Sequence, residues 1–179
     1  MANPLGNDAL ERARHVRLLC CDVDGVLTDG TIYVNDAGAE MKAFNALDGY
    51  AMHMLHEAGI AVAWITGSAA PTVRFRAQRL KVEHVLLDIS DKLTAFDALR
   101  DKLGIPAHQC AHIGDDIPDV PVMRACGFAA TVPHAPPAVR EHAHYVTARE
   151  GGRGAVRELA ELILAAQGRG AHDARLRSS

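Results

Sequence analysis

The sequence predicts an α/β protein with a doubly wound, mostly parallel, Rossmann-like sheet. Short apolar runs recur along the chain, and segments with helical character separate them through short connections. This alternation is typical of a parallel sheet that carries helices on both faces. With 179 residues, 49% of them hydrophobic, the chain is long enough for one compact domain. We expect that domain over residues 17–168, after a lead-in segment at 1–16 and before a flexible tail at 169–179.

The first predicted strand ends in two aspartates. A short lead-in helix over Asp8–Arg14 is followed by Leu18–Cys21, an apolar run bounded by charge. A run this short is typical of a buried parallel strand. Asp22 and Asp24 come directly after it, and open α/β sheets bind ligands at the carboxyl ends of their strands. We therefore expect both carboxylates at the working edge of the sheet.

Residues 30–44 predict a projecting β-hairpin. Two strand-like runs flank Asn35-Asp36-Ala37-Gly38, which is a typical turn sequence. A simple edge hairpin is the alternative. Only this hairpin and one helix separate the first strand from the second, so the chain has no room there for an inserted cap domain.

The remaining elements continue the alternation. Apolar runs predict five further strands, at Ile60–Ile65, within Leu80–Leu87, and at Cys110–Ile113, Phe128–Val132 and Tyr145–Val146. Helices are expected from Asp48 or Gly49 to Ala58, from Pro71 onward, over Asp91–Leu103 and over Ala155–Gln167. Two strands end in polar groups, Thr66-Gly67-Ser68 and Gly114-Asp115-Asp116. Hydroxyl and carboxylate side chains are thus expected at the same edge as Asp22.

Composition excludes several classes of partner. The net charge is −3 and the pI is near 6.3, a balance without a basic footprint that argues against nucleic acid as a partner. No apolar run approaches membrane-spanning length and the N-terminus lacks an apolar signal region, which predicts a soluble cytoplasmic protein. The four cysteines are not in paired spacing, and three of them lie in or beside apolar segments and are interpreted as core residues of a reduced protein. The ten histidines show no metal-binding spacing and are interpreted mostly as surface or structural residues.

The two aspartates after the first strand indicate a metal site. Carboxylates one residue apart at a desolvated strand end repel each other, and Mg²⁺ is the hard, oxygen-seeking ion that suits them. An ordinary turn that caps the strand is the alternative, as an acidic surface loop is for Asp115 and Asp116. Both acidic motifs follow apolar runs that would lie side by side in this fold, and this favours the metal site.

The stretch DVDGVLTDG, residues 22–30, resembles the first motif of the haloacid-dehalogenase superfamily of phosphohydrolases. Over about residues 17–168 the chain resembles the family of 3-deoxy-D-manno-octulosonate 8-phosphate (KDO 8-phosphate) phosphatases. These enzymes remove phosphate from an eight-carbon sugar acid during lipopolysaccharide biosynthesis. The resemblance implies a Mg²⁺-dependent phosphomonoester hydrolase without a cap domain.

The resemblance also implies roles for individual residues. Asp22 would be the nucleophile that forms an aspartyl-phosphate, and Asp24 the acid and base that protonates the leaving alcohol and activates water. Thr66 and Lys92 would meet the phosphate oxygens. The metal would be held by Asp22, the Asp24 backbone carbonyl, Asp115 and Asp116, with Asp119 in support. The implied substrate-binding set is Asp24, Asn45, Asp48, Gly49, Thr66, Gly67, Arg76, Lys92 and Arg157.

The basic residues that would bind the sugar acid depart from the family pattern. Ser68, Leu47 and His53 stand where the resemblance implies basic residues, and each missing guanidinium removes a charge-assisted contact. We therefore expect a phosphatase for a small phosphorylated sugar acid, with KDO 8-phosphate as the leading substrate. The alternatives are a phosphatase for a related nine-carbon keto-sugar-acid phosphate and a non-catalytic binding module that kept the fold.

The resemblance further implies a homotetramer. In relatives the hairpin packs with copies from other subunits into a central barrel. A segment matching Gly151–Glu158 closes over an active site, commonly that of a neighbour, which brings in Arg153 and Arg157. A glycine-rich turn followed by an ordinary amphipathic helix is the alternative for this segment.

Overall fold

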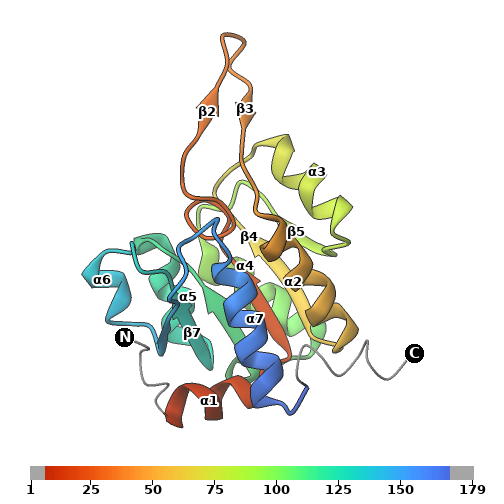
Figure 1. The fold of residues 1–179 in the computed structure, drawn as a ribbon, viewed down its shortest axis with the longest axis vertical. Coiled ribbons are helices and arrows are strands. Elements are labelled where there is room, and N and C mark those ends of the chain that lie inside the picture. Colours follow the sequence, from red (N-terminus) through yellow and green to blue (C-terminus); the bar gives the residue numbers. More distant parts are fainter. Residues whose placement is uncertain (1–6, 170–179) are drawn as a thin grey trace.

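The computed structural model describes residues 7–169, and a six-stranded parallel sheet forms its centre (Figure 1). The strands lie in the order β5-β4-β1-β6-β7-β8. Their bounds are β1 Leu18–Cys21, β4 Ala61–Ile65, β5 His84–Leu86, β6 Cys110–Ile113, β7 Phe128–Thr131 and β8 Tyr145–Val146. With the hairpin set aside this is the strand order of a doubly wound sheet, which confirms the predicted fold class. The order reverses at β1, between β4 and β6.

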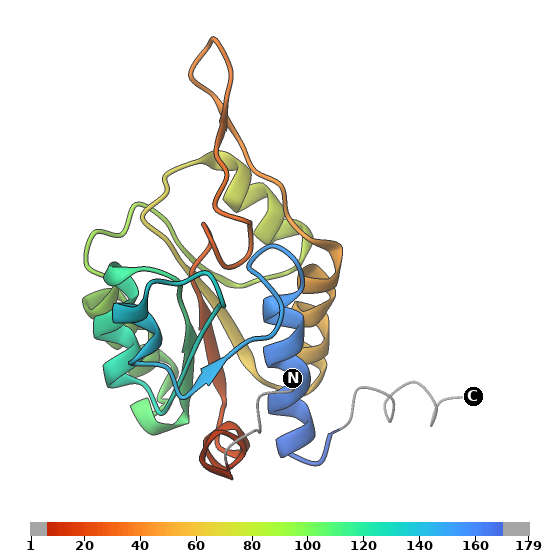
Figure 2. The same cartoon turned by 60° about the vertical axis from the view of Figure 1, so that its left-hand side comes forward.

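Helices cover both faces of the sheet. One layer contains α2 (Ala46–Glu57) and α7 (Ala155–Ala166), and the other contains α4 (Lys92–Leu103) and α5 (Val120–Ala125). Figure 2 shows the sheet between these two layers. The helices α3 (Pro71–Arg79) and α6 (Pro137–Arg140) and the 3-10 turns η1 (Ala107–Gln109) and η2 (Ile117–Asp119) lie in the connections.

The predicted lead-in helix belongs to the core. The helix α1 (Asn7–Arg14) packs against α7 and β7, and Ala9, Ala13 and Val16 are buried. The predicted flexible tail lies almost wholly outside the described residues. Within residues 7–169, no helix is long and apolar enough to cross a membrane.

One predicted boundary shifts for a local reason, and one strand occupies only part of its predicted segment. The helix α2 begins at Ala46, before the predicted Asp48, because the Asn45 side chain accepts the Leu47 backbone N–H and caps the helix. The strand predicted within Leu80–Leu87 is β5, and it has only three residues. The helix α3 extends to Arg79 with Leu80 as its C-terminal cap, which shortens the segment left for the strand.

The hairpin projects away from the sheet, as predicted (Figure 1). Its strands, β2 (Tyr33–Val34) and β3 (Glu40–Met41), pair in antiparallel fashion. The Asn35 side chain accepts the backbone N–H groups of Ala37 and Ala39 and thereby closes the turn. Half or more of the surface is exposed on four apolar side chains of the hairpin, Ile32, Tyr33, Val34 and Met41. The hairpin therefore presents apolar surface that this chain does not cover.

Register brings the ends of the central strands to one edge. Cys21 of β1 lies opposite Trp64 of β4 and Ile113 of β6. The residues just beyond these positions, which include Asp22 and Thr66, therefore meet at the carboxyl edge. The Asp22 backbone N–H donates to the Ile113 carbonyl at 3.0 Å and continues the ladder to that point.

Candidate active site

A tight loop after β1 presents the two aspartates of the first motif. The backbone N–H groups of Val26, Leu27 and Thr28 all donate to the Val23 carbonyl. Gly25 has φ +89°, and a Cβ atom there would lie 2.0 Å from Asp115 Oδ2. Only glycine fits both the backbone conformation and the close approach. The loop is therefore packed directly against the acidic end of β6.

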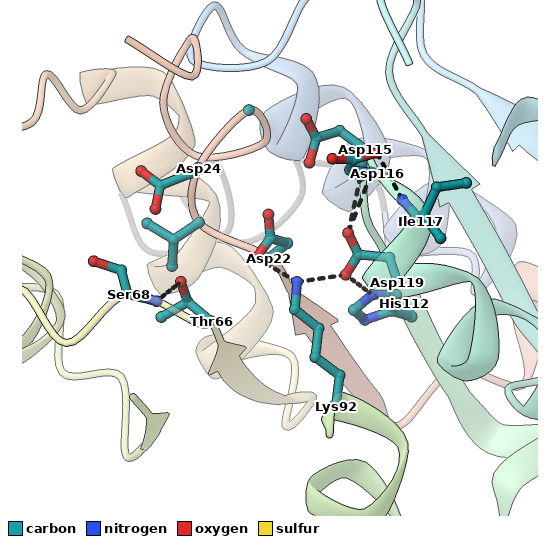
Figure 3. Close-up of polar contacts among 12 residues, drawn as sticks. Asp22, Asp24, Thr66, Ser68, Lys92, His112, Asp115, Asp116, Ile117 and Asp119 are labelled. Carbon is teal, nitrogen blue, oxygen red and sulfur yellow. Dashed lines mark hydrogen bonds and ion pairs between the residues drawn. The ribbon is translucent and has the colours of Figure 1, made fainter. Parts of the chain in front are cut away.

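Three carboxylates converge beside this loop (Figure 3). One oxygen of each of Asp22, Asp115 and Asp119 lies within 4.8 Å of the others. Burial, followed by the charge of Asp119, raises the pKa of Asp22 to about 8. The same two causes raise the pKa of Asp115. Ionising such a cluster is costly without a cation, and the all-oxygen donor set fits a divalent ion such as Mg²⁺.

Lys92 bridges two members of this carboxylate cluster. It is the first residue of α4, whose N-cap is Asp91. Its Nζ atom lies 2.7 Å from Asp22 Oδ1 and 2.7 Å from Asp119 Oδ1. Burial alone would lower the Lys92 pKa, but the charges of Asp22 and Asp119 raise it above its ordinary value. The structure thus places a protonated amine against the predicted nucleophile, where the sequence had placed it only by resemblance.

His112 belongs to the same network, although the sequence analysis did not single it out. Its Nε2 atom lies 2.9 Å from Asp119 Oδ1, and the ring has 0% exposed surface. Burial would raise the pKa of Asp119, but the hydrogen bond from His112 and the charges of His112 and Lys92 lower it to about 2. A histidine inside the apolar strand β6 was the available signal. His112 is thus a buried structural histidine, which the interpretation of the histidines allows, but that interpretation did not place it beside the carboxylates.

Asp116 lies apart from the carboxylate cluster, which differs from its predicted metal role. Its side chain accepts the Ile117 backbone N–H at 2.8 Å and caps η2, and the residue is exposed. Asp119 was predicted only to support the metal, yet its carboxylate stands beside Asp22 and Asp115. The metal role of Asp116 stays a prediction, and Asp119 is a further candidate that the structure places beside Asp22 and Asp115. The Asp24 side chain pairs with Lys42 instead, and the metal contact of the Asp24 backbone carbonyl stays a prediction.

A cavity of about 520 Å³ opens over these carboxylates. The cavity is lined by Asp22 and Asp24 of the first motif, by Lys92 and by the segment Thr66–Ser68. Thr66 Oγ1 accepts the Ser68 backbone N–H at 3.0 Å, which leaves its hydroxyl proton available for a ligand. Residues from the hairpin base, Ile32, Glu40 and Lys42, complete the lining together with Ile89, Ser90 and Pro118. The sequence had not placed any part of the hairpin in the site.

Lys42 is the site residue that sequence reasoning missed most clearly. Its Nζ atom lies 2.6 Å from Asp24 Oδ1 and 3.5 Å from Glu40 Oε2. A charged residue next to a hairpin strand normally faces solvent, so the local pattern gave no signal. Only the fold of the hairpin back onto the loop after β1 brings Lys42 to Asp24.

Five predicted substrate-binding residues lie outside the lining of this cavity: Asn45, Asp48, Gly49, Arg76 and Arg157. Besides capping α2, Asn45 donates from Nδ2 to the Gly152 carbonyl at 3.3 Å. Asp48 accepts the backbone N–H groups of Gly154 and Arg157 at 3.0 and 2.9 Å, at the start of α7. Burial raises the pKa of Asp48. In this chain these contacts join α2 to α7.

The two arginines of that set also make contacts within the chain. The Arg76 guanidinium lies 5.9 Å from the centroid of the Phe44 ring, and a Cβ atom on Gly49 would lie 2.5 Å from its Nη2 atom. Arg157 pairs with Glu161 at 2.7 Å and lies 5.3 Å from the centroid of the Tyr50 ring. Their substrate contacts stay a prediction.

The C-terminal glycine segment packs on the first-motif loop of its own chain. The Gly152 N–H donates to the Val26 carbonyl at 2.8 Å. A Cβ atom on Gly151 would lie 1.7 Å from the Gly25 carbonyl oxygen, so no larger residue fits without movement. The segment therefore supports the loop that carries Asp22 and Asp24.

Comparison with known proteins agrees with this geometry. The profile of the haloacid dehalogenase-like hydrolases matches residues 75–159. The 3-deoxy-D-manno-octulosonate 8-phosphate phosphatase KdsC of Yersinia pestis is 47% identical over 92% of this chain and 88% of its own. A crystal structure of the Moraxella catarrhalis phosphatase of that name, with magnesium, phosphate and KDO, has a TM-score of 0.89 at 44% identity, covering 91% of this chain and 94% of its own.

A third relative matches almost end to end. A hypothetical protein of Xanthomonas campestris is 40% identical with a TM-score of 0.93, and the match covers 99% of this chain and 97% of that one. High identity over nearly full length, together with the shared fold, identifies the family. The chain belongs to the haloacid dehalogenase-like hydrolases and, within them, to the 3-deoxy-D-manno-octulosonate 8-phosphate phosphatase family.

Proposed function

We propose that this protein is a Mg²⁺-dependent phosphatase that hydrolyses KDO 8-phosphate through an aspartyl-phosphate on Asp22. The observation that carries the proposal is the cluster of Asp22, Asp115 and Asp119 with Lys92 bridging two of them. The Moraxella catarrhalis relative was crystallised with magnesium, phosphate and KDO. A buried acidic cluster below an open cavity is suited to a cation and a phosphate group together.

Each residue of the site then has a chemical task. Bound Mg²⁺ would be held by Asp22, Asp115 and Asp119 and would neutralise charge on the phosphate. Asp22 attacks phosphorus while Lys92 and the Thr66 hydroxyl meet the phosphate oxygens. Asp24 gives a proton to the leaving oxygen and later takes one from the water that releases phosphate from Asp22. Asp24 lines the cavity beside Asp22, which suits both proton transfers.

The identity of the substrate has less support in the structure than the phosphatase chemistry has. Ser68 stands in the cavity wall where the family resemblance implies an arginine, so a potential clamp for the sugar-acid carboxylate is absent at that position. Leu47 is exposed on α2, and the ring of His53 lies 6.4 Å from that of Tyr50. A related nine-carbon keto-sugar-acid phosphate is therefore the second candidate substrate.

Phosphate release by the purified protein tests the proposal. The panel contains KDO 8-phosphate, the nine-carbon analogue and simple sugar phosphates, each with Mg²⁺ and with chelator. We expect Mg²⁺-dependent release that is fastest for KDO 8-phosphate. Faster release from the nine-carbon compound would transfer the assignment to that substrate. A folded, metal-binding protein that releases phosphate from no compound would instead support a binding module.

We also propose a homotetramer in which the hairpins of four copies pack together. The exposed apolar side chains of the hairpin, Ile32, Tyr33, Val34 and Met41, support this assembly because a surface of this kind typically marks an interaction site. Light scattering is expected to give the mass of four chains. The variant Val34→Asp should lower that mass, since it places a charge in the interface. A wild-type monomer with full activity would refute the assembly.

We place the protein in the cytoplasm. Its four cysteines, Cys20, Cys21, Cys110 and Cys126, are all buried and free. Burial raises the pKa of each thiol, which makes the thiolate scarce and supports a structural role in a reducing compartment.

A further inference from the structure

Lys42 is a buried lysine that the mechanism above does not use. It follows β3 at the base of the hairpin, and its neighbours Met41 and Ala43 are exposed. The Lys42 side chain itself has 0% exposed surface. Its ammonium group contacts Asp24 Oδ1 at 2.6 Å and Glu40 Oε2 at 3.5 Å. The hairpin thus directs one cation inward, onto the predicted acid and base.

Stability alone is a poor explanation for this ion pair. Burying an ammonium group is costly because the group loses its hydration, and apolar replacements for buried pairs are often neutral or stabilising. The Asp24 side chain is 27% exposed and lines the cavity, so the pair stands at the reaction site rather than in the core. This location points to a role in the chemistry.

The Lys42 side chain is too deeply buried to contact a substrate directly. The whole residue is 7% exposed and its side chain 0%, so the surface that it gives to the cavity is backbone. A substrate in the cavity can reach the Asp24 carboxylate but not the Lys42 ammonium. An effect of Lys42 on the reaction therefore passes through a side chain that it contacts, and Asp24 at 2.6 Å is nearer than Glu40 at 3.5 Å.

We propose that Lys42 is a positioning residue for Asp24, an inference that rests on the proposed phosphatase activity. Within residues 7–169, Lys42 is the hydrogen-bond partner of the Asp24 carboxylate, and the bond goes to Oδ1. Oδ2 is then the oxygen that gives its proton to the leaving oxygen as the ester P–O bond breaks. The same Oδ2 takes a proton from water as water attacks phosphorus and the bond from Asp22 to phosphorus breaks. A fixed carboxylate keeps Oδ2 in reach for both transfers.

The variant Lys42→Met tests this role, because it removes the ammonium and keeps a side chain of similar length. Single-turnover cleavage is measured with Mg²⁺ on two substrates. One is the best sugar phosphate of the panel, whose alcohol needs a proton to leave. The other is p-nitrophenyl phosphate, whose phenolate leaves without one. We expect at least about a 10-fold loss on the sugar phosphate and less than about a 3-fold loss on the aryl ester, with KM almost unchanged.

A double-variant comparison separates positioning from substrate contact. If Lys42 acts through Asp24, then Asp24→Asn with Lys42→Met cleaves the sugar phosphate as fast as Asp24→Asn alone. Additive losses, a raised KM or equal losses on both substrates would overturn the proposal. The matched control is Lys102→Met, the same change on an exposed residue of α4, and it should leave both rates unchanged.

A second variant at Lys42 and the activity of the wild type separate a failure to fold, a failure of the proposed function and a failure of the positioning role. Should Lys42→Met fail to fold, Lys42→Gln retains an N–H donor and should show the same substrate dependence with a smaller loss. Equal losses from Lys42→Gln on the two substrates would equally overturn the positioning role. A wild-type protein that cleaves neither substrate rejects the proposed function, and the role of Lys42 with it. An active wild type with equal losses rejects only the role of Lys42.

Discussion

The variant Asp22→Asn is expected to lose phosphatase activity by at least about 10⁴-fold, the order of loss when a group of this kind is removed. An amide cannot form the covalent phosphoryl intermediate, and it also removes one anionic ligand from the metal site. The measurement is phosphate release with saturating Mg²⁺ and KDO 8-phosphate. A variant that keeps even a tenth of wild-type activity would exclude Asp22 as the nucleophile.

The same variant should also change how the free energy of unfolding depends on pH. Measuring this dependence shows at the same time whether the variant is folded. The pKa of Asp22 in the folded protein is raised to about 8 from an ordinary value of 3.8. The folded state therefore binds more protons than the unfolded state between those values, and metal-free wild-type protein should lose stability as pH rises from about 4 to 8. Asp22→Asn should weaken this pH dependence. Chemical denaturation without metal at several pH values measures it.

The variant Lys92→Met is expected to have the largest effect on stability. Lys92 neutralises Asp22 and Asp119, whose side chains are 8% and 1% exposed. Removing one partner of a buried ion pair typically costs about 3–5 kcal/mol in the free energy of unfolding. Loss of the cation beside the phosphate should also lower turnover by about 10²–10³-fold.

Metal should restore part of the stability that Lys92→Met loses. Such a recovery would show that the loss comes from the missing positive charge rather than from altered packing. A divalent ion between the carboxylates replaces some of the missing positive charge, so Mg²⁺ should raise the unfolding midpoint of Lys92→Met. Urea denaturation with and without Mg²⁺ measures this, and Lys102→Met is again the exposed control. A metal-free Lys92→Met protein as stable as the wild type would contradict the role of Lys92 in holding the cluster.

The sequence predicted the elements whose signals are local. Each buried strand is a short apolar run, so β1 and β6 were placed at their observed bounds. The turn at Asn35–Gly38 predicted the hairpin for the same reason. The start of α2 was predicted too late, because the Asn45 side chain caps the helix and advances its first residue to Ala46. The strand predicted within Leu80–Leu87 lies there as β5.

The position of Asp22 and Asp24 at the carboxyl edge of the sheet was determined by the sequence alone, because a buried strand ends there and charge follows it. Which groups meet them was decided by the tertiary structure. Lys92 is 70 residues from Asp22 along the chain, and Lys42 is 18 residues from Asp24. The position of Asp119 beside Asp22 and Asp115 depends on how η2 turns after β6. Contacts of this kind have no local periodicity, and only the packed fold determines them.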